Sequence, residues 1–375
     1  MKFLKYITLA VCAMAFTQEA SAQTIVRIVG STAYRAQMNT ALKNLINGTA
    51  GAGFGYVGGS QTGANQSIYK GTVGGNSVIY LTSMAGSTGG IQIVVQGLNS
   101  NFLLPSATTS VAGTSGLPAG TDSQLADCDM ADTTQAATQF TSPSLTANKV
   151  GVITFQWIAN KGAPANLTNV TPQMVKALYA AGTVSMATFT GVPTDDAVTL
   201  YAVGRDFDSG TRSATFAEMG ISNIDPVNQY QLTTSGGAIT SEVIWPPYTL
   251  LGLPVVEGNG GYSSGGLIAT AFGNTSPAAK AYISYVGVSD AVTAVGLGAK
   301  ALTFMGVPYS LENVYNGSYA FWNYQFLCYR TTLTGTKKTL ADALANRIKN
   351  FDALVKLTDM RVVRNNDGGV ITQDY

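Results

Sequence analysis

One short stretch of the sequence concentrates side chains that can bind an anion. An apolar run is followed by Arg205, Asp206 and Asp208, then by Ser209-Gly210-Thr211 and Arg212. A guanidinium can donate two parallel hydrogen bonds to an oxyanion. A turn of small residues at a helix start lets an anion approach unpaired backbone N–H groups. This spacing predicts an oxyanion site between a strand and a helix.

Two other segments, residues 24–46 and 77–98, have the same order of apolar strand, Gly/Ser/Thr turn and helix pattern. Their turns are Ser31-Thr32-Ala33 and Ser87-Thr88-Gly89. Each turn alone is typical of an ordinary helix N-cap. Together with the first stretch they would supply donors on several sides of a tetrahedral anion. Strands that alternate with helices predict an α/β architecture, in which ligands bind beyond the carboxyl ends of the strands.

Composition excludes several kinds of chemistry. The chain contains no histidine, which removes Ser-His-Asp catalysis, Cys-His catalysis and His-ligated zinc. Gly261–Gly265 matches the GxSxG nucleophile elbow, but the chain has no histidine that could act as the general base for its serine. Cys128 and Cys328 could form one disulfide or remain two buried thiols. With no CxxC motif and no nearby ligand partner for the cysteines, we expect no metal site. The missing histidine and the missing metal cluster also lead us to expect no enzymatic activity, and we expect no cofactor.

The N-terminus has the pattern of a secretory signal. Lys2 and Lys5 precede the short apolar segment Ile7–Phe16, and Ala20-Ser21-Ala22 forms a small-residue cleavage site. Cleavage after Ala22 would send the protein to the periplasm or outside the cell. Removal of residues 1–22 leaves equal numbers of basic and acidic residues. Charged residues make up 11% of the chain, against about 25% in soluble domains, so we expect no binding to nucleic acid.

The chain resembles the phosphate-binding proteins of phosphate ABC importers, which are type II periplasmic solute-binding proteins. The resemblance lies in Gly30-Ser31-Thr32, Gly86-Ser87-Thr88-Gly89-Gly90, Asp129-Met130-Ala131-Asp132, Arg205–Thr211, Trp245-Pro246 with Gly258–Gly261, and Ile283–Gly287. The most distinctive motif is Arg205–Thr211, an Arg followed after three residues by Ser-Gly-Thr. The resemblance implies ligand contacts at Thr32, Ala33, Ser87, Asp132, Arg205, Ser209, Gly210 and Thr211.

The role implied for Asp132 has a physical reason. An ionised carboxylate only accepts hydrogen bonds, so it repels an anion unless that anion carries a proton. Monohydrogen phosphate carries one at neutral pH, whereas sulfate does not. The alternative role for Asp132 is to cap a helix before Thr133.

The sequence departs from the family pattern in three places. The insert Pro105–Gln124 lengthens the spacing before Asp132. Phe207 stands where the family has an acid that orients the arginine. Ala33-Tyr34-Arg35 follows the first turn, and Arg35 with Arg212 would enlarge the positive charge for a bigger anion.

The resemblance implies two α/β lobes with a ligand cleft between them, joined by two crossings. One lobe would hold residues 23–147 and 285–375, and the other residues 148–284. The expected function is a secreted, monomeric solute-binding protein that delivers phosphate or a related oxyanion to an ABC permease. A surface, extracellular-matrix or adhesion protein that reuses the fold is the alternative. The missing histidine disfavours a phosphatase.

Patterns outside the candidate site predict further elements. Thr171 and Pro172 would start a helix, and Thr339–Leu357 would form a packing helix. The Gly/Ser/Thr-rich inserts Asn47–Gly75 and Pro105–Gln124 would be surface loops or irregular hairpins. The aromatic run at 315–330 would be a hairpin around an Asn-Gly turn, packed on the core.

Overall fold

The computed structural model describes residues 23–222 and 224–374, so the predicted signal segment lies outside the described residues. In this part of the chain, no helix has the length and apolar character needed to cross a membrane. The α-helices are α2 (Arg35–Ile46), α3 (Ser87–Gln96), α4 (Pro172–Ala181), α5 (Ala187–Thr190), α6 (Gly210–Met219), α7 (Gly265–Phe272), α8 (Val288–Gly296), α9 (Leu311–Tyr315) and α10 (Gly335–Arg347). The strands are β1 (Thr24–Gly30), β2 (Gly53–Val57), β3 (Gln66–Val73), β4 (Asn76–Met84), β5 (Asn99–Phe102), β6 (Thr114–Leu117), β7 (Asp122–Leu125), β8 (Cys128–Ala131), β9 (Leu145–Ala159), β10 (Asn169–Val170), β11 (Thr183–Ser185), β12 (Thr199–Ala202), β13 (Tyr230–Ser235), β14 (Ala238–Ile244), β15 (Tyr248–Leu250), β16 (Leu253–Val255), β17 (Lys280–Gly287), β18 (Lys300–Ala301), β19 (Thr303–Phe304), β20 (Trp322–Arg330), β21 (Val362–Val363) and β22 (Thr372–Gln373).

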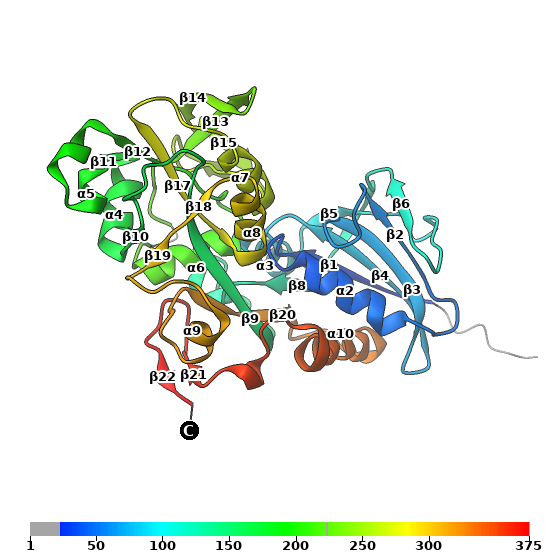
Figure 1. The fold of residues 1–375 in the computed structure, drawn as a ribbon. Helices are drawn as coiled ribbons and strands as arrows, with labels where there is room; N and C mark the ends of the chain where they lie inside the picture. Colours follow the sequence, from blue (N-terminus) through cyan, green and yellow to red (C-terminus); the bar gives the residue numbers. More distant parts are fainter. Residues whose placement is uncertain (1–22, 223, 375) are drawn as a thin grey trace, which may run out of the picture.

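One sheet of 12 strands runs through the molecule in the order β11-β12-β17-β9-β20-β8-β1-β4-β3-β2-β6, with β18 also paired to β9. Strand β9 lies in its middle: its first residues pair with β20, and its last residues pair with β17 and β18. Figure 1 shows the blue and cyan N-terminal strands in one half and the green and yellow segments in the other. The predicted two-lobed α/β architecture is therefore confirmed. The predicted lobe boundary at residue 148 falls inside β9, and it stays a prediction.

In the first half, the two turns that carry candidate site residues lie at the same edge of the sheet as Asp132. Strand β1 lies between β4 and β8 and is parallel to both. Gly30 at its end is in register with Met84 of β4 and Met130 of β8. Because parallel strands end at one edge, the turns after Gly30 and Met84 and the residue Asp132 lie close together.

The second half supplies the opposing face. Strand β12 is parallel to β17 and leads into the Arg205 loop and then α6. Ser209 is the N-cap of α6, and its hydroxyl accepts a hydrogen bond from the Arg212 N–H at 3.3 Å. The left-handed Gly220 ends the helix. This short strand-loop-helix unit holds Arg205, Ser209 and Thr211 toward the first half.

Several sequence predictions need correction. The prediction of surface loops or irregular hairpins for the Gly/Ser/Thr-rich inserts holds in part: β2 and β3 form an antiparallel hairpin, whereas β6 pairs with β2 in parallel and β7 pairs with β5. The aromatic run is not a hairpin: it follows α9 into β20, which pairs with β9 and β8, although Tyr319 and Phe321 are buried as predicted. The predicted C-terminal helix ends at Arg347, a single π-helical segment follows, and Leu354 is exposed. The predicted Thr171 cap of α4 is confirmed.

The two cysteines are buried neighbours without a disulfide. Cys128 and Cys328 lie on the adjacent strands β8 and β20 and are free thiols. Burial is the main reason that the pKa of each thiol lies well above its usual value. Thiolates are therefore disfavoured, and these side chains serve as small apolar groups of the core.

Candidate oxyanion site

The eight sequence-predicted site residues lie where the two halves face each other: contacts join Thr32, Ser87, Asp132, Arg205, Gly210 and Thr211, while Ala33 and Ser209 adjoin Thr32 and Gly210 in the chain. Four come from the first half and four from the Arg205 loop and α6. Each is buried: Thr32, Ala33, Ser87, Asp132, Arg205, Ser209, Gly210 and Thr211. Residues that are far apart in the sequence thus form one enclosed cluster.

Arg205 spans the two halves. It is 1% exposed, and one of its terminal nitrogens donates to the hydroxyl of Thr32 at 3.0 Å. The other terminal nitrogen lies 3.4 Å from the Thr211 hydroxyl. The carbonyls of Tyr262 and Ser263 accept from the guanidinium at 3.1 and 3.0 Å. These two carbonyls fix the plane of the guanidinium, so its free edge points at the hydroxyls of the cluster.

Asp132 lies opposite Arg205 and also contacts both halves. Its Oδ1 accepts a hydrogen bond from the Ser87 hydroxyl, and its Oδ2 accepts one from the Thr211 hydroxyl at 2.8 Å. Burial raises the pKa of Asp132 above its usual value, while the two hydroxyls and Arg205 act in the opposite direction. Both hydroxyl bonds favour the ionised form. Asp132 is therefore an acceptor within a cluster of donors.

The first turn of α6 lies directly against Asp132. A methyl group placed on Gly210 would lie 2.1 Å from Asp132 Oδ1 and 2.5 Å from Ser87 Cβ. Only glycine allows this approach. The first N–H groups of a helix have no partner within it, and the helix dipole adds positive charge there. The carboxylate of Asp132 thus occupies the place at this helix start that suits an anion.

Further contacts hold the two faces together. The Thr88 and Ser213 hydroxyls are hydrogen-bonded at 2.8 Å. The Gly89 N–H donates to the carbonyl of Asp208 at 2.9 Å. Helices α3 and α6 therefore meet end to end at the site, in a closed arrangement of the two halves.

The two acidic residues of the motif, Asp206 and Asp208, contact groups other than the Arg205 guanidinium. Arg205 makes no ion pair with any described residue, so neither Asp206 nor Asp208 neutralises it through a direct salt bridge. Asp206 accepts from the Phe207 N–H at 2.7 Å and from the Tyr248 hydroxyl. Asp208 accepts the hydrogen bond of the Gly89 N–H through its backbone carbonyl. Its Oδ1 is buried without a partner among the described residues, and burial raises its pKa to about 7.

Neither of the two extra arginines enlarges the site in this arrangement. Arg212 is fully buried, and its terminal nitrogens donate to the carbonyl and side chain of Asn259. It lies over the ring of Phe216 and supports the Arg205 loop from behind. Arg35 donates to the side chain of Asn65 at 2.7 Å. The expectation of a larger positively charged site is therefore not met by these contacts.

Sequence reasoning missed the carbonyls that orient Arg205. Tyr262 and Ser263 come 57 and 58 residues later, in the segment that fits a GxSxG elbow. The backbone carbonyls of that segment hold the Arg205 guanidinium in place, and Ser264 is the N-cap of α7. The residue that could have indicated this contact is Gly261, because a methyl group there would lie 2.2 Å from the carbonyl oxygen of Arg205.

Comparisons with known proteins bear on the fold. No protein-family model matches the sequence, and no curated protein sequence matches it significantly. A Clostridium perfringens structure described as a phosphate ABC transporter substrate-binding protein with bound phosphate is similar, with a TM-score of 0.52 and 16% identity; the match covers 89% of this chain and 100% of that one. An ABC-type phosphate transport receptor from Vibrio cholerae has a TM-score of 0.44 and 13% identity, over 86% of this chain and 93% of that one. PstS from Borrelia burgdorferi has a TM-score of 0.41 and 12% identity, over 88% and 94%.

The fold assignment rests on the Clostridium perfringens structure, because that match has a TM-score of 0.52 and covers most of both chains. Its low identity restricts the comparison to the fold. The chain therefore has the two-lobed α/β fold seen in that substrate-binding protein structure.

Proposed function

We propose that the protein is a solute-binding protein that holds phosphate or a related oxyanion between its two halves. The observation that carries the proposal is the meeting of Arg205, Asp132 and three hydroxyls from both halves in one buried cluster. The similar structure from Clostridium perfringens, which contains bound phosphate, supports it.

The cluster offers an anion both charge and hydrogen-bond donors. Arg205 would supply charged hydrogen bonds, and the hydroxyls of Thr32, Ser87 and Thr211 would supply neutral ones. The start of α6 at Ser209 and Gly210 adds backbone N–H groups. Ser87 and Thr211 now donate to Asp132, so binding requires the two faces to separate until the anion takes over these donors.

Asp132 would then select the anion by its proton. Facing monohydrogen phosphate, the ionised carboxylate accepts the hydrogen bond of the P–OH group. Facing sulfate, it meets only acceptor oxygens, and the buried repulsion disfavours binding. The site therefore favours phosphate and arsenate over sulfate.

Isothermal titration of the purified chain with phosphate, arsenate and sulfate tests the proposal. We expect saturable one-to-one binding of phosphate and arsenate, with sulfate at least tenfold weaker, equivalent to about 1.4 kcal/mol. Absence of heat and of thermal stabilisation with all three anions would reject an oxyanion function.

Export and delivery to an ABC permease complete the proposed function. They follow from the signal-like N-terminus and from the fold, and they place the protein in the periplasm or outside the cell, as a monomer. Pull-down of a permease with the phosphate-loaded protein, but not with an Arg205→Ala variant, is the expected result. Retention of the chain in the cytoplasm of its host would contradict this part alone.

A further inference from the structure

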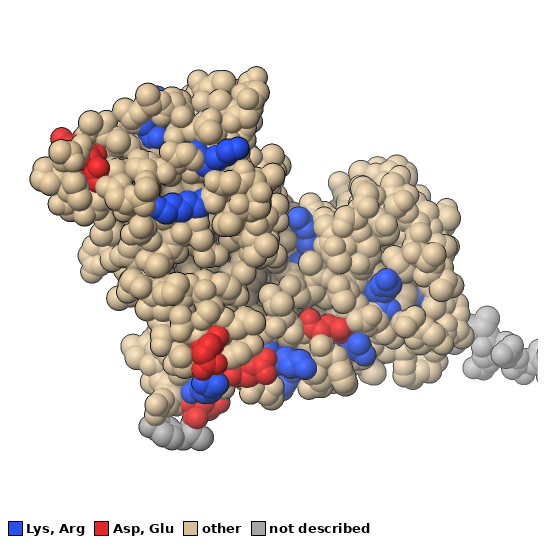
Figure 2. Space-filling model, viewed as in Figure 1, with Lys and Arg blue, Asp and Glu red and all other residues tan. Residues whose placement is uncertain are grey.

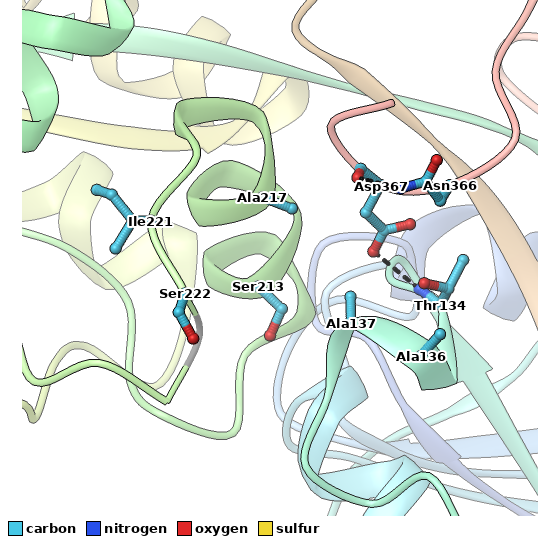
Figure 3. A pocket seen from close by; sticks show the side chains of 9 residues that line it. All are labelled: Thr134, Ala136, Ala137, Ser213, Ala217, Ile221, Ser222, Asn366 and Asp367. Carbon is cyan, nitrogen blue, oxygen red and sulfur yellow. Dashed lines mark hydrogen bonds between the residues drawn. The ribbon is translucent and has the colours of Figure 1, made fainter. Parts of the chain in front are cut away.

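The loop between β21 and β22 lies where the two halves meet. These strands pair with each other, and the segment Arg364–Gly368 between them, here termed the C-terminal strap, contacts both halves. Figure 3 shows Asp367 of the strap bonded to Thr134 of the first half, with Ala217 of α6 opposite. A cavity of about 310 Å³ lies between them. The strap thus has one face toward the first half and one toward α6.

Asp367 fixes the strap beside the candidate oxyanion site. Its Oδ2 accepts a hydrogen bond from the Thr133 hydroxyl at 2.5 Å and one from the Thr134 N–H at 2.9 Å. These two threonines directly follow Asp132 in the chain. The strap is therefore attached to the segment of the first half that carries Asp132.

Arg364 fixes the strap to strand β20. Its guanidinium donates to the carbonyls of Trp322 and Ala320 at 2.9 and 2.7 Å and lies over the Trp322 ring. Trp322 begins β20, which pairs with β8 of the first half. Because the contacts of Arg364 with β20 do not involve α6, the arginine stays with the first half when α6 moves away.

The strap reaches the second half through the last turn of α6. Arg364 forms an ion pair with Glu218 at 2.7 Å, and the two side chains are only 1% and 13% exposed. A methyl group on Gly368 would lie 2.2 Å from the carbonyl oxygen of Ala217, so the backbone of the strap touches the helix. The same helix carries Ser209-Gly210-Thr211 at its other end.

Helix α6 is therefore held against the first half at both ends. Thr211 contacts Asp132 at its start, and Glu218 contacts Arg364 at its end. We propose that Arg364 and Glu218 are positioning residues that control how readily the two halves separate. Separation takes Glu218 away from Arg364, and a buried ion pair that loses one partner leaves an uncompensated charge. The strap is thus a clasp that keeps the candidate site closed.

The clasp has a kinetic consequence that rests on the proposed function. An anion can enter or leave only while the halves are apart, because the donors of the site lie between them. The ion pair is formed in the closed protein with or without an anion, and it is broken in the open one. It therefore slows anion association and dissociation by the same factor and leaves the affinity unchanged.

Hydrogen exchange of the anion-free protein measures opening without any ligand. The Gly89 N–H donates to the Asp208 carbonyl across the two halves at 2.9 Å, so it exchanges when they separate. Glu218→Gln removes the charge of the acceptor. We expect it to raise exchange at Gly89 about tenfold or more, as for loss of a charged hydrogen bond. The amides of β1, which bond within the first half, should keep their wild-type rates.

Two further variants make this measurement decisive. Glu312→Gln is the matched control: it removes the exposed partner of Arg361, three residues before the arginine of the strap, and should leave exchange at Gly89 unchanged. Gly368→Ala pushes the strap away from α6 and should act in the same direction as Glu218→Gln, so the test does not depend on one variant folding. Unchanged exchange at Gly89 in either folded strap variant would overturn the proposal, as would equal acceleration in β1.

Stopped-flow tryptophan fluorescence with phosphate extends the test to the candidate site. Glu218→Gln should raise the association and dissociation rate constants by the same factor as exchange at Gly89, with the dissociation constant unchanged. A fall in affinity with an unchanged association rate would contradict the clasp. Faster exchange at Gly89 in a protein that binds no phosphate would support the clasp and reject the proposed function.

Discussion

Arg205 contributes to the packing of the protein as well as to the candidate site. As an exposed ion-pair partner it would contribute at most about 1 kcal/mol to folding. In the structure it is buried and bonded to the carbonyls of Tyr262 and Ser263. Loss of this side chain leaves the Ser263 carbonyl without its partner, whereas the Tyr262 carbonyl still accepts from the Asp206 N–H, so we expect an effect on folding as well as on binding.

Arg205→Ala should weaken phosphate binding by roughly two orders of magnitude, since charged hydrogen bonds contribute about 1.5–3 kcal/mol each. It should also lower the free energy of unfolding by roughly 1–3 kcal/mol. Calorimetric titration and urea unfolding measure the two effects. Arg212→Ala is the matched control: it removes an equally buried arginine that faces Asn259, so stability should fall while phosphate affinity falls much less. Equal losses of affinity in the two variants would contradict the role of Arg205.

Asp132 controls which anion is accepted, according to the proposed function. Asp132→Asn replaces an acceptor-only group with an amide that can also donate, so sulfate loses its repulsive contact. We expect the ratio of phosphate to sulfate affinity to fall at least tenfold, mainly because sulfate binds better. Titration of wild type and variant with both anions gives the ratio. An unchanged ratio would show that Asp132 does not read the proton of the ligand.

Asp208 makes stability depend on pH. Burial raises its folded-state pKa to about 7 from a usual value of 3.8, so between these two pH values the folded state holds a proton that the unfolded state has lost. Stability from this group is complete below the lower value and is lost as pH rises through about 7. Asp208→Asn should therefore raise the urea midpoint more at pH 8 than at pH 5. The opposite trend would mean that the carboxyl is ionised in the folded protein.

At the scale of elements, the start of α6 is a contact surface between the halves. Gly210→Ala suits the helix itself, but the added methyl group would meet Asp132 and Ser87. We expect the closed arrangement to be lost, with a larger radius of gyration in small-angle scattering and weaker phosphate binding. Gly266→Ala in the first turn of α7 has its nearest foreign atom at 3.8 Å and serves as the control. Compaction equal to wild type in both variants would refute the contact.

The elements also show which features a single sequence can predict. The turns at Ser31, Ser87 and Ser209 were predictable because each follows from a local order of strand, small residues and helix. Strand β20 was not, because Asn316-Gly317 is a strong local hairpin signal, whereas its actual partners β9 and β8 lie far away in sequence. Leu354 fits the helical period, yet the chain leaves the helix before it to pass β9, where Val355 bridges to Val152.

The same distinction applies to the candidate site. Its eight residues could be named from motifs and from a family resemblance, because small hydroxyl residues at helix starts keep their chemistry in any context. The partners of Arg205 could not, since backbone carbonyls carry no side-chain signature and come from another turn.

At the scale of the whole molecule, low charge is a visible property of the surface. Figure 2 shows a face that is mostly uncharged, with a notch between the halves and several of its charged residues along the lower edge. Exposed ion pairs such as Arg361 with Glu312 occur in the structure, and pairs of this kind contribute little to stability. If the protein binds an oxyanion as proposed, its specificity would depend on the buried cluster more than on long-range attraction by this face.

Strand β9 has a consequence for how the protein melts. Its single backbone is hydrogen-bonded into both halves, and one apolar cluster extends from Val26 in the first half to Phe216 in the second. Neither half can lose its fold without stripping hydrogen bonds and apolar contacts from the other. Differential scanning calorimetry should show a single transition with equal calorimetric and van't Hoff enthalpies; two resolved peaks would contradict this. Thermodynamically, the two lobes are one cooperative unit, and neither lobe expressed alone should be a stable protein.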